Sequence, residues 1–118
     1  NFELPLRAGQ HLGGHYVLGH VDTVSTVKSI DPDSQAWTIK INIPQPFEKY
    51  VVYKGSIAVN GTSLTINKVD PGSIELCIIP VTLEKTNFGN LAPDDLVNLE
   101  FDILAKYTEK LLISNHVQ

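Results

Sequence analysis

Two alternating runs joined by Asn-Gly make up the stretch Lys54-Gly55-Ser56-Ile57-Ala58-Val59-Asn60-Gly61-Thr62-Ser63-Leu64-Thr65-Ile66. Asn-Gly readily takes the positive φ angles of a tight hairpin turn, so the stretch predicts a β-hairpin. Alternation gives the second strand a polar face and an apolar face, which carry Ser63, Thr65 and Asn67 and, opposite them, Leu64 and Ile66. The apolar face can join a core, while the polar row suits an uncharged ligand rich in hydroxyl groups.

Other parts of the chain predict further strands and turns. Residues 37–43, 74–79 and 97–103 alternate with period two, which indicates strands. Asp70-Pro71-Gly72-Ser73 is a turn cluster placed to close a hairpin between residues 62–69 and 74–79, and a second cluster occupies 31–34. Short helical turns are expected at 46–52 and 82–87. Many short strands with turns at this spacing predict an all-β protein built as a small antiparallel barrel.

The tail of the chain changes its period. Leu104, Tyr107, Leu111 and Leu112 fall on one helical stripe, so residues 102–118 are expected to form a C-terminal helix. This stripe either covers the open end of the chain's own barrel or forms a contact with another subunit.

Composition limits the classes of function. The chain has 118 residues, of which 42% are hydrophobic and 19% charged, and this is enough for one domain with a core. A net charge of -4 argues against nucleic acid as a partner. No apolar run approaches the roughly 18 residues of a membrane span. The single cysteine, Cys77, lies in an apolar run and is expected to be buried, and it fits a reducing, cytoplasmic compartment.

A second unusual stretch is Gly13-Gly14-His15-Tyr16-Val17-Leu18-Gly19-His20-Val21-Asp22. Its glycines allow a ligand to approach the backbone, and a histidine can move protons near neutral pH. On an extended strand His15 and His20 face opposite sides, and His11 and His15 lie about 13 Å apart. No metal site is therefore expected, and a lone histidine is ordinarily a surface or hydrogen-bonded residue.

These two stretches, together with Ile79-Pro80-Val81-Thr82-Leu83-Glu84-Lys85-Thr86 and Val97-Asn98-Leu99-Glu100, resemble the C-terminal half of riboflavin synthase. The matching segments cover nearly the whole chain in the same order. The resemblance implies a six-stranded antiparallel Greek-key barrel with short helical turns and a C-terminal helix. It also implies that residues 1–12 are the tail of a preceding barrel, 13–101 the lumazine-binding barrel and 102–118 the helix.

The resemblance implies a dismutation in which two molecules of 6,7-dimethyl-8-ribityllumazine exchange a four-carbon unit. The products are riboflavin and 5-amino-6-ribitylamino-pyrimidinedione. In the family each site is shared between the first barrel of one subunit and the second barrel of another, so this chain would supply half of a site. The implied partners are the lumazine, riboflavin, a first barrel domain and further copies in a trimer; no cofactor is implied.

The resemblance also implies catalytic and ligand-binding roles for the residues of this chain that match the family's motifs. His20 and Thr65 would help to activate the methyl group or water. The ribityl hydroxyls and the ring would be held by Lys54, Asn60, Ser63, Gly14, Ile79 and Thr82. The alternative function is a lumazine- or flavin-binding module without turnover. A third possibility, the flavin-binding barrel of a reductase, would be expected to accompany a Gly-x-Gly-x-x-Gly unit, which this chain does not contain.

Overall fold

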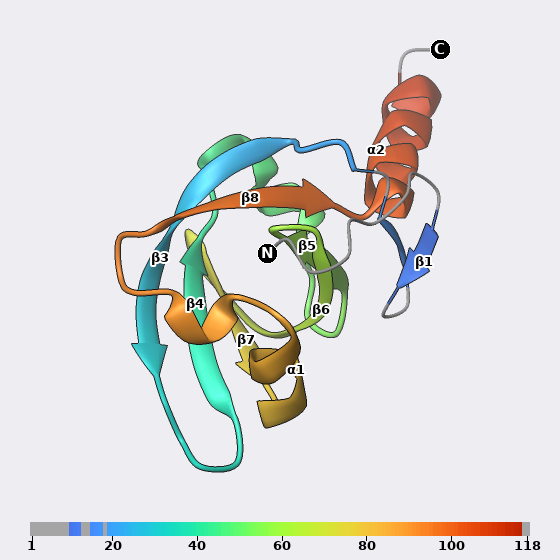
Figure 1. Cartoon of the computed structure of the whole chain (residues 1–118). Coiled ribbons are helices and arrows are strands. Elements are labelled where there is room, and N and C mark those ends of the chain that lie inside the picture. Colours follow the sequence, from blue (N-terminus) through green and yellow to red (C-terminus); the bar gives the residue numbers. More distant parts are fainter. Residues whose placement is uncertain (1–9, 13–14, 18, 117–118) are drawn as a thin grey trace.

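A computed structural model describes residues 10–12, 15–17 and 19–116 of this chain, and the side chains of residues 19–113. Six strands form a closed barrel, and a C-terminal helix stands beside it (Figure 1). The barrel strands are β3 (Thr23–Asp31), β4 (Trp37–Asn42), β5 (Ser56–Val59), β6 (Thr62–Asp70), β7 (Ser73–Ile78) and β8 (Leu96–Phe101). A separate two-stranded sheet pairs β1 (Gln10–Leu12) with β2 (His15–Val17).

The strand order around the barrel is β3-β4-β7-β6-β5-β8, and every pair is antiparallel. Strands β5, β6 and β7 follow one another through hairpins, and β8 returns to pair with β5. This order is that of a Greek key. The all-β barrel expected from the sequence is therefore confirmed. Strand β3 was not predicted from the sequence, because its residues mix polar and apolar side chains and follow no clean alternation.

Two of the predicted hairpins form with the expected turns. Asn60 and Gly61 connect β5 to β6 with φ angles of 49° and 82°, as the Asn-Gly dipeptide requires. The second turn joins β6 to β7 with Asp70 opposite Ser73, and Gly72 takes a φ of 78°. Positive φ at these positions explains why asparagine and glycine occupy them.

The barrel interior is filled by branched aliphatic and aromatic side chains from every strand. The largest fully buried ones are Phe88, Phe101, Ile39, Ile41, Ile57, Ile66, Ile74, Leu76, Ile78, Leu99 and Val27. Leu64 packs against this cluster, so the apolar face predicted for β6 does join the core. Burying so many apolar side chains is the main source of the free energy that holds a small barrel together.

Short helices cover the barrel where strands leave it. The 3-10 helix η1 (Gln45–Tyr50) packs Phe47 on Phe101 with ring centroids 5.2 Å apart. Helix α1 (Pro80–Lys85) follows β7, and the 3-10 helix η2 (Phe88–Asn90) buries Phe88. These helices correspond to the helical turns expected at 46–52 and 82–87.

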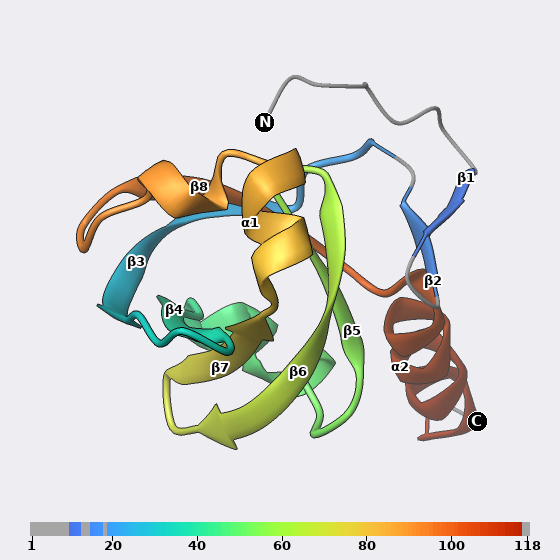
Figure 2. The same ribbon diagram turned by 60° about the horizontal axis from the view of Figure 1, so that its bottom comes forward.

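The C-terminal helix α2 (Ile103–His116) projects from the end of β8 and lies to one side of the barrel (Figures 1 and 2). Its apolar stripe is exposed, with Leu104, Tyr107 and Leu111 each at least 60% accessible. The stripe therefore does not cover the barrel of its own chain. No helix within the described residues is long and apolar enough to cross a membrane.

Two expectations from the sequence are wrong. Cys77 is exposed rather than buried, because it shares the outer face of β7 with Glu75 while Ile74, Leu76 and Ile78 point inward. In addition, His15 and His20 do not lie on one strand. Strand β2 ends at Val17, and Gly19 takes a φ of 77°, which breaks the extended path before His20.

Candidate functional site

The outer face of the β5–β6 hairpin carries the residues that the sequence singled out on β6. Thr65 lies opposite Ser56 and is exposed. Ser63 lies opposite Ala58, which in turn lies opposite Glu100 on β8. This outer row is covered, since Glu100, Ala58 and Ser63 are only 7%, 1% and 9% accessible. The predicted polar row is thus exposed at Thr65 and Asn67 and buried at Ser63.

Strands β6 and β7 separate at the end of the barrel that α1 follows. Their ladder runs from Asp70 opposite Ser73 as far as Ile66 opposite Leu76. Beyond it, residues 62–65 pair with β5, whereas Cys77 and Ile78 pair with β4. The backbone of Ile66 bonds toward the β5 side, accepting from Lys54 N–H and donating to Gly55 O. Alternation then directs the backbone of Thr65 toward the widening between β6 and β7.

Ile79 and Thr82 stand on the other side of this widening. Ile79 is the first residue after β7 and is 53% accessible. Its carbonyl oxygen accepts a hydrogen bond from the Thr82 N–H at 3.0 Å, which fixes the first turn of α1. The structure therefore places the exposed hydroxyl and strand-edge backbone of Thr65 on β6, where the β6–β7 ladder ends, and the exposed Ile79 and half-buried Thr82 just after β7.

Lys54 and Asn60 lie at opposite ends of β5. They are six positions apart in the sequence, which is at most about 20 Å along an extended strand. Both take positive φ angles, of 67° and 49°. Asn60 bridges to β8, because its Oδ1 accepts from Asn98 N–H at 2.8 Å and its own N–H donates to Asn98 O at 2.9 Å. Lys54 is thus near the Thr65 end of the hairpin, and Asn60 is not.

His20 lies in the connection from β2 to β3, and its side chain is exposed. The preceding Gly19 N–H donates to Glu100 Oε1 at 3.1 Å. A small cleft of about 180 Å³ beside this bond is lined by Gly19, Val21, Ala58, Gly61, Asn98, Leu99 and Glu100. Strand β2, which precedes this segment, approaches β6, with Cα atoms of the two strands within 8 Å of each other. Gly14 lies outside the described residues.

Glu100 was missed as a candidate from the sequence. Glu100 is on the same outer face of β8 as Leu96 and Asn98, which are exposed, so the alternation predicts that its carboxylate is exposed as well. Its burial depends on a segment about 80 residues earlier in the chain. A buried carboxylate needs hydrogen-bond partners, and Gly19 supplies one of them.

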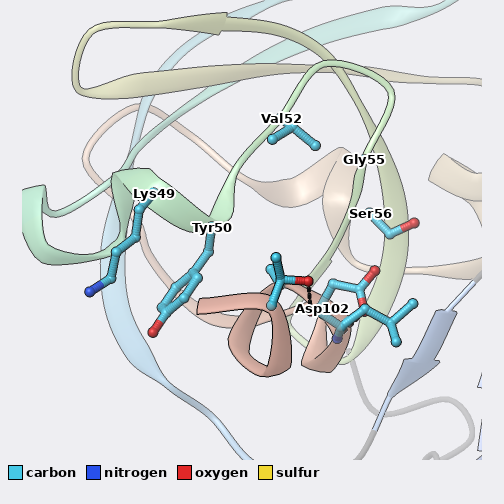
Figure 3. Close-up of a pocket in the computed structure, with 9 residues that line it drawn as sticks. Lys49, Tyr50, Val52, Gly55, Ser56 and Asp102 are labelled. Carbon is cyan, nitrogen blue, oxygen red and sulfur yellow. Dashed lines mark hydrogen bonds between the residues drawn. The ribbon is translucent and has the colours of Figure 1, made fainter. Parts of the chain in front are cut away.

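A larger cleft lies between η1, the turn at residues 52–55 and α2 (Figure 3). Its volume is about 340 Å³, and its lining includes Tyr50, Val52, Ser56, Asp102 and Ala105. This cleft could not be predicted from the sequence, because its walls come from segments about 50 residues apart.

A charged cluster bridges the rim of this cleft. The Tyr50 hydroxyl donates to Glu109 Oε1 at 2.6 Å, and Lys49 forms an ion pair with the same carboxylate. The hydrogen bond from Lys49, followed by that from Tyr50, holds the pKa of Glu109 below its usual value of 4.5. The hydrogen bond with Glu109 in turn raises the pKa of Lys49 and of Tyr50.

Metal ligands do not gather anywhere in the part of the chain that the structure describes. No three His, Cys, Asp or Glu side chains come close enough there to hold an ion.

Comparisons with known proteins agree with this geometry. Residues 18–102 match the lumazine binding domain family. The chain is 42% identical over 112 residues to the riboflavin synthase of Photobacterium leiognathi, covering 95% of this chain and 51% of that protein. It is 42% identical over 113 residues to the riboflavin synthase of Schizosaccharomyces pombe, covering 95% and 54%. The chain thus spans about half the length of these relatives.

Solved structures show the same barrel. LumP in complex with riboflavin superposes with a TM-score of 0.73 at 26% identity, over 79% of this chain and 50% of that one. LumP in complex with 6,7-dimethyl-8-(1'-D-ribityl) lumazine also gives a TM-score of 0.73, at 24% identity and over 78% and 52%. Since the family match extends over most of the barrel and the fold agrees, this chain belongs to the lumazine binding domain family.

Proposed function

We propose that this barrel binds 6,7-dimethyl-8-ribityllumazine and riboflavin as the second barrel of a riboflavin synthase. The observation that carries the proposal is the widening between β6 and β7. There Thr65 presents a hydroxyl and strand-edge backbone on β6, and the exposed Ile79 follows the end of β7. A flat heterocycle could lie against Ile79 and exchange hydrogen bonds with the backbone edge. Thr82 borders the same space from α1.

Protein side chains would mainly orient the reactants in the proposed dismutation. Two lumazine molecules contain together the atoms of one riboflavin and one 5-amino-6-ribitylamino-pyrimidinedione, so no oxidant or cofactor is needed. Holding the two rings in opposition supplies most of the rate enhancement, and positioned proton carriers supply the rest. In this proposal Thr65 orients water or shares a proton, and His20 transfers a proton to or from the reacting molecules.

His20 and Thr65 come from different segments of the chain, and in this proposal they act on different parts of the bound molecules. Lys54, Asn60 and Ser63 are assigned to the ribityl hydroxyls, and Gly14 to the ring. Because Lys54 and Asn60 lie at opposite ends of β5, a single ribityl chain would contact only one of them in this barrel. The other would then meet a ligand held by a neighbouring barrel.

The same proposal assigns the domain boundaries of the chain and its assembly with other subunits. Residues 1–12 follow an earlier barrel, 13–101 form the ligand-binding barrel, and 102–118 form the helix through which three copies associate in the cytoplasm. A site shared with the first barrel of another subunit would then be completed by assembly. Such a chain would bind ligand by itself and need the first barrel for turnover.

A second candidate function is ligand binding without turnover. It is favoured by the likeness to LumP, whose structures hold the lumazine, riboflavin or flavin mononucleotide. Optical spectra separate the two functions, because lumazine and riboflavin differ in absorption. The chain is incubated with lumazine, alone and joined to a first barrel, and the formation of riboflavin is followed.

Fluorescence titration with lumazine and riboflavin tests the binding that both functions share. We expect saturable binding of both, and weaker binding of lumichrome, which lacks the ribityl chain. Equal affinity for lumichrome would show that the barrel does not recognise the ribityl group. Binding without any riboflavin formed by the two-barrel protein would establish the binding module instead of the synthase.

A further inference from the structure

The short segment that carries His20 is fixed to β8 at both of its ends. At its start, Gly19 N–H donates to Glu100 Oε1 at 3.1 Å. At its end, Asp22 N–H donates to Leu99 O at 2.8 Å. The exposed His20 side chain therefore extends from a backbone that is anchored on either side.

The Asp22 carboxylate adds two further contacts. Its Oδ2 accepts from the Phe101 N–H at 2.8 Å, at the last residue of β8. Its Oδ1 accepts from Lys106 Nζ on α2 at 2.7 Å. The two side chains are partly shielded, with 19% of Asp22 and 29% of Lys106 accessible. Short, charge-assisted bonds of this kind hold their partners more firmly than neutral ones.

Helix α2 is held against the barrel by polar side chains rather than by an apolar face. Lys106 and Glu109 lie one turn apart and reach Asp22 and the Lys49–Tyr50 pair. The apolar residues Tyr107 and Leu111 are instead exposed to solvent, and Leu104, which is also exposed, borders the cleft between η1 and α2. An ordinary surface helix shows the opposite arrangement. The Lys106–Asp22 pair is therefore one of the contacts that fix where α2 lies.

We propose that Lys106 is a positioning residue for His20, acting through the Asp22 carboxylate, so that the placement of α2 and the geometry of the His20 segment are coupled. The inference rests on the role of His20 in the proposed function. Lys106 itself touches no substrate. Its ammonium holds Asp22 in the orientation that also binds the Phe101 amide, and this keeps residues 19–22 in place on β8.

Amide hydrogen exchange on this chain tests the coupling without any activity. In Lys106→Met, which keeps the length of the side chain but removes its charge, the Asp22 and Phe101 amides should exchange about fivefold faster. The matched control is Lys110→Met, an exposed lysine one turn further along α2, which should leave both rates unchanged. Unchanged exchange in Lys106→Met, or equal acceleration in both variants, would overturn the proposal.

A double mutant isolates the pair. Asp22→Asn keeps an oxygen for the Phe101 amide and removes the negative charge. When Lys106→Met is added to Asp22→Asn, no further acceleration should occur, since the interaction is already lost. Full additivity of the two effects would show that Lys106 acts elsewhere and would refute the proposal.

Kinetics of the two-barrel protein distinguish positioning from mere stabilisation. Lys106→Met should lower kcat several-fold while leaving the dissociation constant for lumazine unchanged, measured at a temperature where both proteins are folded. A normal kcat despite faster exchange would refute the positioning role.

His20→Ala is measured in parallel. Full activity in His20→Ala would refute the role assigned to His20 in the proposed function. A slow His20→Ala beside a fully active Lys106→Met would refute the coupling alone.

Discussion

The Tyr50 hydroxyl donates a hydrogen bond to Glu109 Oε1 at 2.6 Å and so joins helix η1 to helix α2 across 59 residues of sequence. Lys49 forms an ion pair with the same carboxylate. Together with the Lys106–Asp22 pair, this contact places α2 relative to the barrel. The position of α2 should therefore respond to conditions that change the charges of these groups.

We expect the link between η1 and α2 to be complete at neutral pH and to weaken toward both extremes. The pKa of Glu109 is lowered from 4.5 by its hydrogen bonds, so its contribution is present above pH 4.5 and is lost as the pH falls through the lowered value. The pKa of Tyr50 is raised from 10.0, so its contribution is present below pH 10 and is lost as the pH rises through the raised value. NMR shifts of the Tyr50 ring, with Glu109→Gln as control, check this; a Tyr50 shift insensitive to acid would contradict it.

Gly55→Ala should destabilise the fold by about 1–3 kcal/mol, as overpacking usually does. A Cβ at Gly55 would lie 2.8 Å from Val52 Cγ2 and 3.0 Å from the Val52 backbone oxygen, in the turn beside the larger cleft. Gly89→Ala is a matched control, because its nearest contact there would be an ordinary 3.9 Å. Urea unfolding of the two variants measures the difference. Equal stability would mean that the turn relaxes around the added methyl group.

Leu111→Glu should dissociate an oligomer if the exposed stripe on α2 joins copies of the chain. Leu111 is 65% accessible in the single chain, so its replacement removes no contact within the barrel. Lys110→Glu changes charge at the neighbouring exposed position and serves as the control. Sedimentation velocity gives the result. Unchanged sedimentation with a lower melting temperature would instead indicate a contact within the chain.

His20→Ala should slow turnover of the two-barrel protein by about 100-fold or more, the usual scale for a positioned acid–base group. Thr65→Ala should cost less, since a threonine hydroxyl cannot act as a base near pH 7. Steady-state rates and dissociation constants are measured for both variants. If His20→Ala keeps its rate and loses only affinity, His20 is a ligand contact, and the proton transfers belong to the first barrel or to the substrate.

Local chemistry explains the parts of the fold that the sequence predicted. Asn60-Gly61 and Gly72 provide the positive φ angles of their turns, and alternation assigns Leu64 and Ile66 to the core. These features depend on neighbours within a few residues, so they can be recognised before the fold is known. Cys77 could also have been placed correctly, because it stands two residues after the outward Glu75.

Contacts between distant segments of the chain decided the features that the sequence did not predict. The apolar stripe of α2 could be recognised from its helical period. The contacts that turn the stripe outward could not, because Lys106 on α2 bonds to Asp22 across 84 residues of sequence and Glu109 on α2 bonds to Tyr50 across 59. Likewise, the buried Glu100 accepts a hydrogen bond from Gly19, which lies 81 residues earlier in the chain. The sequence by itself determined the barrel strands other than β3, the turns and the resemblance that pointed to the family, since these depend on local pattern. The tertiary structure decided which side chains are covered and which way α2 faces, because these depend on how the barrel closes.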